Sequence, residues 1–132
     1  MSPKPDIYPA LRYGNAPRAI EWLCRAFGFE KLSVMTRDDG GIAHAELKLG
    51  NGVIMLGGNA SEPVSPRPRE EDFSRIEWSI YVAVDDIDAH YQRSRREGAE
   101  IFRTLEQTGY GSREYSARDL EGFVWSFGTY RP

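Results

Sequence analysis

The feature that most constrains the fold of this chain is an internal repeat. A shift of 70 residues superposes small and charged residues of the first half on the same residues of the second half. The coincident pairs are Ala19 and Ala89, Arg25 and Arg95, Gly28 and Gly98, Glu30 and Glu100, Gly52 and Gly122, and Gly58 and Gly128. The glycines fall where a helix should end or a hairpin should turn, and such positions favour glycine. We interpret the pattern as a duplicated module; the alternative is that any two runs with this element order carry glycine at their turns.

The first half predicts a strand, a helix and three further strands. Asn15 is suited to cap the helix, Pro17 lies in its first turn and Gly28 ends it. Between them apolar residues recur at helical spacing, whereas residues 42–49 alternate as in a strand. We expect Ala43, Ala45, Leu47 and Leu49 on one face of that strand and His44, Glu46 and Lys48 on the other. The expected elements are a helix at 16–27 and strands at 7–13, 29–36, 42–49 and 53–56.

The second half predicts the same order of elements. Asp86 is suited to cap a helix that Gly98 ends. The expected elements are a helix at 87–97 and strands at 76–84, 100–105, 112–118 and 123–127. The segment before them is rich in Gly, Ser and Pro, which is typical of a linker or a loop that covers a site.

A single βαβββ unit leaves one face of its sheet without a partner, because its helix covers only the other face. We therefore expect an α+β fold in which two βαβββ modules pair their mixed sheets around a central cavity, with the helices outside. We expect the 132 residues to form one domain, with module 1 at 5–58, a linker at 59–75 and module 2 at 76–130.

Composition excludes several classes of partner. The net charge is −3 and the pI is near 5.4, so nothing attracts the chain to nucleic acid or an anionic membrane. No apolar run approaches the length of a membrane span, and the start MSPKPDIYPA does not resemble a signal peptide.

The lone Cys24 cannot form an internal disulfide, and we expect it to be buried and inert. The expected compartment is the cytoplasm.

The segment 110–130 is the most densely patterned part of the chain. Asp119-Leu120-Glu121-Gly122 predicts a hairpin turn between two aromatic-rich strands. Alternation on the last strand should place Trp125 and Phe127 under the helices, and Val124 and Ser126 toward the cavity.

Four segments together resemble the vicinal-oxygen-chelate superfamily of glyoxalases, bleomycin-resistance proteins and extradiol dioxygenases. They are LRYGNAPRAIEWLCRAFGFE, IAHAELKLGNGVIML, VAVDDIDAHYQRSRREGAEI and SARDLEGFVWSFGTY. The resemblance covers nearly the whole chain in the family's order and implies the fold described above. It is weak for activity, because this superfamily hosts many chemistries on one scaffold.

The resemblance also implies where a metal would be held. The family's metal enzymes carry ligands on the first strand of each module and on the last strand of the second. Here those positions fall on Tyr8, on Ser79 (or Trp78 if the register slips by one) and on Ser126. Tyrosine and serine hold a divalent metal poorly, so we expect no cofactor. Metal-free members resemble antibiotic-binding resistance proteins, which sequester a ligand and are often homodimers.

His44 and Glu46 are the first candidates for chemistry, since both lie on one face of a strand. They form either an acid/base pair, a substitute metal site or an ordinary polar sheet face. The repeat aligns Glu114 with His44 and Ser116 with Glu46, so Glu114 is a third candidate catalytic residue. The expected ligand-binding residues are Tyr8, Arg12, His44, Glu46, Ser79, Tyr81, Tyr110, Val124 and Ser126. Arg113 is a further cavity candidate, although it has the opposite strand parity to Glu114.

Three hypotheses follow for function. The first is metal-independent binding of a small, aromatic or planar molecule, with Tyr8, Tyr81 and Tyr110 stacking on it. The second is a lyase, isomerase or dioxygenase-type enzyme, working by acid/base chemistry or with a divalent metal held by His44, Glu46 and Glu114. The third is a protein that acts by association.

His90 is expected to be a partly exposed helix residue rather than a ligand.

Overall fold

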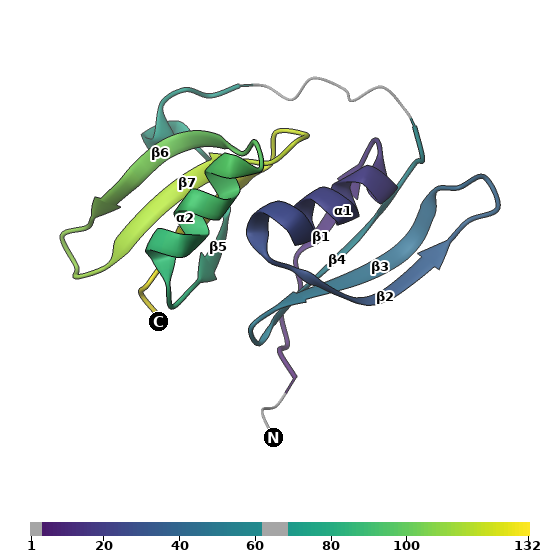
Figure 1. Ribbon diagram of the computed structural model, residues 1–132, viewed down its shortest axis with the longest axis horizontal. Coiled ribbons are helices and arrows are strands. Elements are labelled where there is room, and N and C mark those ends of the chain that lie inside the picture. Colours follow the sequence, from purple (N-terminus) through teal and green to yellow (C-terminus); the bar gives the residue numbers. More distant parts are fainter. Residues whose placement is uncertain (1–3, 62–68) are drawn as a thin grey trace. The chain divides into compact units, whose positions relative to one another are not determined.

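Figure 1 shows the computed structural model, which describes residues 4–61 and 69–132. The chain divides into two units, residues 1–65 and 66–132, at a point inside the expected linker. The first unit contains β1 (Ala10–Tyr13), α1 (Ala16–Phe27), β2 (Glu30–Thr36), β3 (Ile42–Leu49) and β4 (Gly52–Gly58). The second contains a 3₁₀ turn η1 (Phe73–Arg75), β5 (Ile80–Ala83), α2 (Ile87–Arg96), β6 (Glu100–Gln107), β7 (Arg113–Arg118) and β8 (Val124–Gly128).

Each unit folds into one four-stranded mixed sheet and one main helix (Figure 1). The strand order is β1-β4-β3-β2 in the first sheet and β5-β8-β7-β6 in the second. In both sheets the first strand runs parallel to the last, and the other neighbours are antiparallel. The α+β class and the two βαβββ modules are confirmed. The pairing of the two sheets around a shared cavity stays a prediction.

Helix α1 forms as its sequence predicts. The Asn15 side chain accepts a hydrogen bond from the Arg18 N–H, and Gly28 ends the helix with a φ of 86°, a left-handed conformation that favours glycine. The apolar stripe of α1 is buried: Ala16, Ala19, Ile20, Leu23 and Phe27. Among the residues that the structure describes, neither helix is long and apolar enough to cross a membrane.

The two modules do not follow one constant shift. Asn15 and Asp86, which cap the two helices, lie one residue further apart than the shift of 70, as do Leu56 and Phe127 on the last strands. Strands β3 and β7 keep the shift of 70, because Ala45 on β3 pairs with Leu56 and the equivalent Tyr115 on β7 pairs with Phe127. The second helix region is one residue shorter and the second hairpin one residue longer. Ser126 is therefore structurally equivalent to Met55.

Three strand predictions need correction. The strands predicted at 7–13 and 76–84 begin only at Ala10 and Ile80. Pro9 has no N–H to donate to the ladder, although its carbonyl accepts a hydrogen bond from the Met55 N–H at 2.8 Å. Ala43 is exposed rather than facing the helix, because the pairing of β3 with β4 shifts register between Ile42 and Ala45.

Two further predictions meet the structure only in part. Cys24 was expected to be buried, but the structure places it half-buried on α1. Part of the expected linker is ordered against the second sheet, and we call residues 69–75 the strap. Positions 62–68 of that linker lie outside the described residues.

The strap is attached to the second sheet by charged and aromatic contacts. The Arg69 guanidinium donates two hydrogen bonds to Glu100 on β6, and Arg118 on β7 donates to the Glu70 carbonyl. The Phe73 ring lies 5.9 Å from the Phe102 ring. Hydrogen bonds from Arg69 hold the pKa of Glu100 below its ordinary value.

Asp119 organises the turn between β7 and β8. Its carboxylate accepts hydrogen bonds from the backbone N–H groups of Glu121 and Phe123, at 2.9 and 3.1 Å, and from Trp125 Nε1 at 3.1 Å. The residue is only 6% exposed. The hairpin predicted from the Asp-Leu-Glu-Gly sequence is confirmed, and Asp119 also connects the turn to the largest fully buried side chain, Trp125.

Replacing Asp119 by alanine should destabilise the protein strongly. The change leaves two backbone N–H groups and one indole N–H without their acceptor, so we expect the free energy of unfolding to fall by about 3 kcal/mol. Urea denaturation followed by tryptophan fluorescence measures it. Asp38→Ala is the matched control, because Asp38 is an exposed turn carboxylate and should change the free energy by less than about 0.5 kcal/mol. Equal effects of the two substitutions would contradict this role of Asp119.

The ion pair of the strap should make stability depend on pH. Because the pKa of Glu100 is lowered from 4.5 in the folded protein, the pair stabilises the fold above about pH 4.5 and loses this effect as the pH falls through the lowered pKa. Glu100→Gln should therefore lower the melting temperature near neutral pH, with a deficit that shrinks in acid. Glu77→Gln, at an exposed carboxylate, should show no deficit. A Glu100→Gln deficit that is the same in acid and at neutral pH would refute the linkage.

Candidate functional site

The face of the first sheet opposite α1 carries the polar residues singled out from the sequence. Ala45 and Leu47 on β3 are fully buried, and Ile54 and Leu56 on β4 are nearly so. Since side chains alternate along a strand, His44, Glu46 and Lys48 on β3 and Val53 and Met55 on β4 lie on the opposite face. Of these, Glu46 pairs with Met55 and Lys48 pairs with Val53, whereas His44 lies in the irregular stretch of β3 between Ile42 and Ala45.

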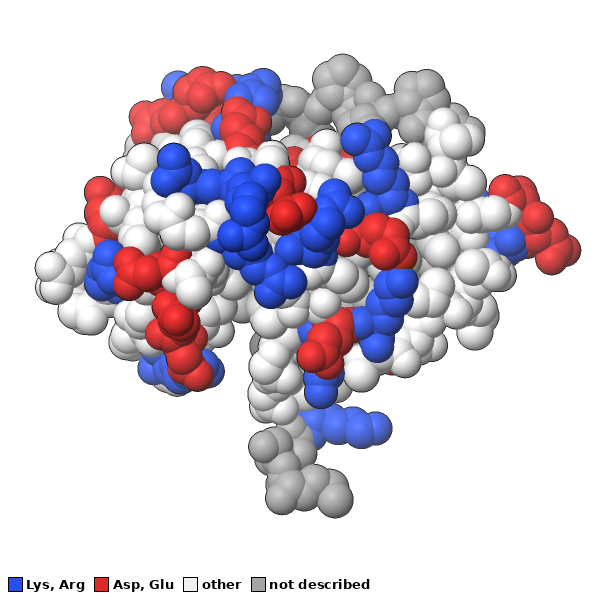
Figure 2. All heavy atoms as spheres, in the orientation of Figure 1, with Lys and Arg blue, Asp and Glu red and all other residues white. Residues whose placement is uncertain are grey.

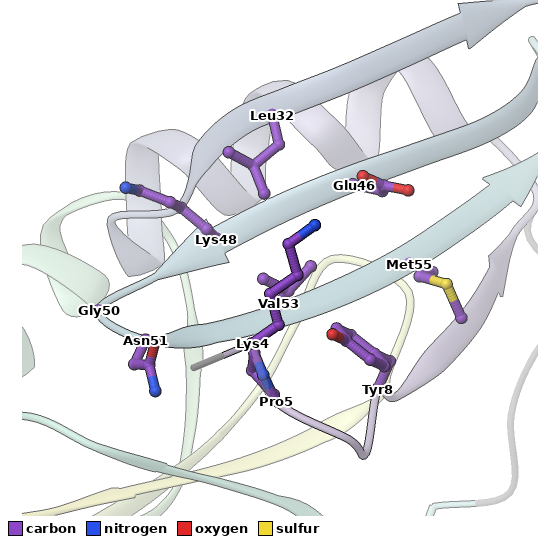
Figure 3. A pocket seen from close by; sticks show the side chains of 10 residues that line it. All are labelled: Lys4, Pro5, Tyr8, Leu32, Glu46, Lys48, Gly50, Asn51, Val53 and Met55. Carbon is purple, nitrogen blue, oxygen red and sulfur yellow. The ribbon is translucent and has the colours of Figure 1, made fainter. Parts of the chain in front are cut away.

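Two pockets lie on this face. The first, of about 490 Å³, is shown in Figure 3 and is lined by side chains from the N-terminal segment, β2, β3 and β4. Its apolar lining includes Tyr8, Leu32, Val53 and Met55, and its charged lining is Lys4, Glu46 and Lys48. The second, of about 470 Å³, includes Arg12, His44 and Met55. Met55 lines both, so the two pockets are neighbours on the sheet.

His44 and Glu46 form a direct contact where the two pockets meet. His44 Nε2 lies 2.9 Å from Glu46 Oε2, and the two side chains are 41% and 40% exposed. His44 lines the second pocket and Glu46 the first. The structure thus brings together four of the predicted ligand-binding residues on one face: Tyr8, Arg12, His44 and Glu46.

A network of hydrogen bonds crosses the second sheet. Glu114 on β7 is only 4% exposed, and its carboxylate accepts from Tyr110 Oη at 2.7 Å and from Arg103 Nη2 at 3.2 Å. Arg103 Nε also donates to Ser116 Oγ at 3.3 Å, and Ser116 Oγ lies 2.8 Å from Ser126 Oγ. The predicted residues Tyr110, Glu114 and Ser126 therefore belong to one network.

Packing and electrostatics fix this network in place. The hydrogen bond to Glu114 raises the pKa of Tyr110, which keeps its phenol protonated as a donor. The Arg103 guanidinium stacks 4.4 Å above the ring of Phe73 in the strap. A Cβ at Gly128 would approach Glu114 Cγ and Tyr81 Oη to 2.6 Å, so only glycine leaves room there. Glu114 is thus neutralised by Arg103 and enclosed.

The remaining predicted residues of the second unit take separate positions. Tyr81 donates from its hydroxyl to the Tyr130 carbonyl at 2.7 Å, and burial raises its pKa. Ser79 directly precedes β5, and Val124 begins β8 and is half-buried. Arg113 was a cavity candidate, but its guanidinium pairs with Asp88 on α2 at 2.7 Å, as its opposite parity to Glu114 requires.

On the helix side of the second sheet, a histidine has a structural role. Tyr115 Oη donates to Ser94 Oγ at 2.9 Å, so the 2.6 Å contact between His90 Nδ1 and Tyr115 Oη assigns the proton to Nδ1. The His90 ring lies 4.4 Å from the ring of Phe127. Burial raises the pKa of Tyr115. The predictions that His90 is partly exposed and that Trp125 and Phe127 lie under the helix are confirmed.

Sequence reasoning missed several residues of these surfaces. Leu32 and Met55 were assigned only to the strands expected at 29–36 and 53–56, and Lys48 only to the polar face of the strand at 42–49. Arg103 could not be assigned a face, because β6 shifts its register against β7 on both sides of this residue. The repeat offers no signal for Met55, because the shift of 70 aligns Ser126 with Leu56, and only the strand pairing aligns Ser126 with Met55.

The residues at the family's ligand positions do not fit a divalent metal. Tyr8 and Ser126 are poor ligands, Ser79 is no better, and Met55 at the equivalent position of the first module offers only a thioether. Ser126 Oγ is already hydrogen-bonded to Ser116. Within residues 4–61 and 69–132, no three His, Cys, Asp or Glu side chains are close enough to share a metal ion.

Comparison with known proteins agrees with this fold. The solved structure of TioX from Micromonospora sp. ML1 is 33% identical, with a TM-score of 0.69 over 92% of this chain and 97% of that chain. Glyoxalase I from Zea mays is 18% identical with a TM-score of 0.71, over 95% of this chain and 44% of that chain, which shows the fold alone. The uncharacterised protein Mb0911c of Mycobacterium bovis is 29% identical over 95% of this chain and 83% of its own length.

The match to a family model covers more of the chain than any single motif. The model of the glyoxalase/bleomycin resistance protein/dioxygenase superfamily matches residues 8–127, which include both modules. The resemblance seen in the sequence is confirmed, and the chain belongs to the glyoxalase/bleomycin resistance protein/dioxygenase superfamily.

Proposed function

We propose that this protein binds a small molecule on the face of the first sheet opposite α1, without a metal ion. The observation that carries the proposal is the pocket of about 490 Å³ on that face, which lies in the range typical of ligand sites. Its partner of about 470 Å³ extends the surface past Met55. The homodimer and the cytoplasmic location expected from the sequence stay predictions.

The lining of the pocket suits an apolar, planar ligand. The Tyr8 ring and the side chains of Val53, Met55 and Leu32 supply apolar contact, while Glu46 supplies a hydrogen-bond acceptor (Figure 3). A thioether adapts its shape to different partners, so Met55 supports a site that accepts related molecules. A few polar groups among apolar walls are typical of sites that orient a ligand.

Metal-independent binding is supported by the donor chemistry of the family's ligand positions. Tyr8 lies in the wall of the pocket, where its ring contributes apolar surface. The position that carries a glutamate ligand in the metal enzymes is Ser126, which is bonded to Ser116. Tyr8 and Ser126 are thus suited to a site that holds its ligand by apolar contact and hydrogen bonding, without a metal ion.

The apolar fluorescent probe N-phenyl-1-naphthylamine tests the pocket directly. We expect saturable binding, and Tyr8→Ala should weaken it about tenfold, because loss of an aromatic contact typically costs about 1–1.5 kcal/mol. Met55→Lys should weaken it further by placing a charge in the apolar wall. Tyr130→Ala is the control, as it removes an aromatic ring that is 47% exposed in the second unit. Absence of saturable binding, or equal effects at Tyr8 and Tyr130, would refute the proposed site.

An acid/base enzyme is the second candidate function, and the contact between His44 and Glu46 favours it. A carboxylate 2.9 Å from an imidazole can orient the ring and support proton transfer to a bound molecule. Such an enzyme would need the same surface for its substrate. Measuring the metal content of the protein distinguishes an acid/base pair of His44 and Glu46 from a metal site that includes the same two residues.

Elemental analysis of protein purified without chelators should find no stoichiometric Zn, Ni, Mn or Fe. His44→Ala should leave the metal content unchanged, and Glu77→Gln serves as a control at an exposed carboxylate. One metal ion per chain that disappears in His44→Ala would overturn metal-independent binding and establish a metal enzyme instead.

A further inference from the structure

The pocket of the first sheet has a positively charged end and a negatively charged end. Lys48 and Glu46 are two residues apart on β3, and their neighbours across the ladder are Val53 and Met55. Figure 3 shows the same order: Lys48 lies toward the turn at Gly50 and Asn51, and Glu46 lies toward Met55. Residues two apart on a strand are separated by about 7 Å, so a ligand of modest size spans both ends.

The two ends differ in the contacts that their charged groups make. The Glu46 carboxylate lies 2.9 Å from His44 Nε2, within hydrogen-bond distance. Lys4 and Lys48 line the pocket, and in the part of the chain that the structure describes neither forms an ion pair with an acidic side chain. By contrast Lys31, on the same sheet, pairs with Glu21 at 2.6 Å. With two ammonium groups and one carboxylate in its lining, the pocket carries a net positive charge.

The charge pattern of the pocket differs from the pattern seen on other parts of the molecule. On the face drawn in Figure 2, basic side chains lie interspersed with acidic ones. Ion pairs of the second unit, such as Arg113 with Asp88 and Arg131 with Asp85, follow the same pattern. The pocket instead combines one glutamate, an apolar wall and two lysines that form no ion pair with the residues described by the structure.

We infer that the ligand of this pocket is an amphiphile with an apolar, planar body and an anionic head such as a carboxylate or sulfonate. The body lies against Tyr8, Val53 and Met55, and the head binds the ammonium groups of Lys48 and Lys4. The inference rests on the proposed function and specifies the class of ligand. An ammonium attracts an anion most strongly where apolar walls exclude water, and the attraction weakens with salt.

Two probes with one skeleton separate the contribution of the head from that of the body. 8-Anilinonaphthalene-1-sulfonate carries the anionic group, and N-phenyl-1-naphthylamine lacks it. The sulfonate should bind several-fold more tightly than the neutral probe at low salt, and the difference should shrink at high salt. Tyr8→Ala should weaken both probes, which places them in the same pocket.

Charge substitutions then identify the residue that recognises the head. Lys48→Gln should weaken the sulfonate about threefold to tenfold and change the neutral probe by less than about twofold, as expected for one partly exposed ion pair. Lys48→Arg should restore sulfonate binding. Lys31→Gln is the matched control, because Lys31 lies outside the pocket and is already paired. Near-ultraviolet circular dichroism verifies that each variant is folded.

Each outcome bears on a different claim. If neither probe binds, the proposed function and this inference both fail. If the neutral probe binds in a Tyr8-dependent manner while sulfonate binding is no tighter, or is insensitive to Lys48→Gln, the site stands and the anionic ligand is refuted. Weakening of both probes by Lys48→Gln in a folded variant also refutes it, because the lysine would then shape the pocket rather than bind the head.

Discussion

The buried carboxylate of Asp119 is the contact on which the C-terminal half of the fold depends. It satisfies two backbone N–H groups of the turn and the indole N–H of Trp125. By closing the turn at one length, it sets which residues of β8 face α2. Trp125 and Phe127 then pack beneath the helix, and Ser126 lies on the opposite face beside Ser116. A turn one residue shorter would exchange these faces, because side chains alternate along a strand.

The same one-residue effect explains how the two modules correspond. A constant shift would align Ser126 with Leu56, which is buried beneath α1. The longer second hairpin aligns it with Met55, which lines the pockets of the first sheet. The two faces opposite the helices have diverged in chemistry. The second is filled by the network of Glu114, Arg103 and Tyr110 and by the strap, whereas the first leaves pockets beside charged side chains.

This difference gives the two modules separate roles in the proposed function. In the second module each charged group of the network has a partner, and Phe73 covers Arg103, so the network stabilises the sheet. In the first module His44 and Glu46 contact each other but remain about two-fifths exposed, at 41% and 40%. A surface that keeps polar groups exposed next to apolar walls is suited to a ligand.

The sequence by itself determined the family, the order of the elements, the helix caps and the face on which His44 and Glu46 lie, because periodicity and cap chemistry are local properties. Only the tertiary structure decided which of these residues meet. A register shift in β3 changed the face that alternation predicts for Ala43, and the shifts in β6 on both sides of Arg103 leave alternation without a prediction for that residue. Both kinds of shift depend on pairing between neighbouring strands. Met55, Leu32 and Lys48 become parts of one pocket only when β2, β3 and β4 lie side by side, and no local pattern distinguishes them from ordinary core and surface residues.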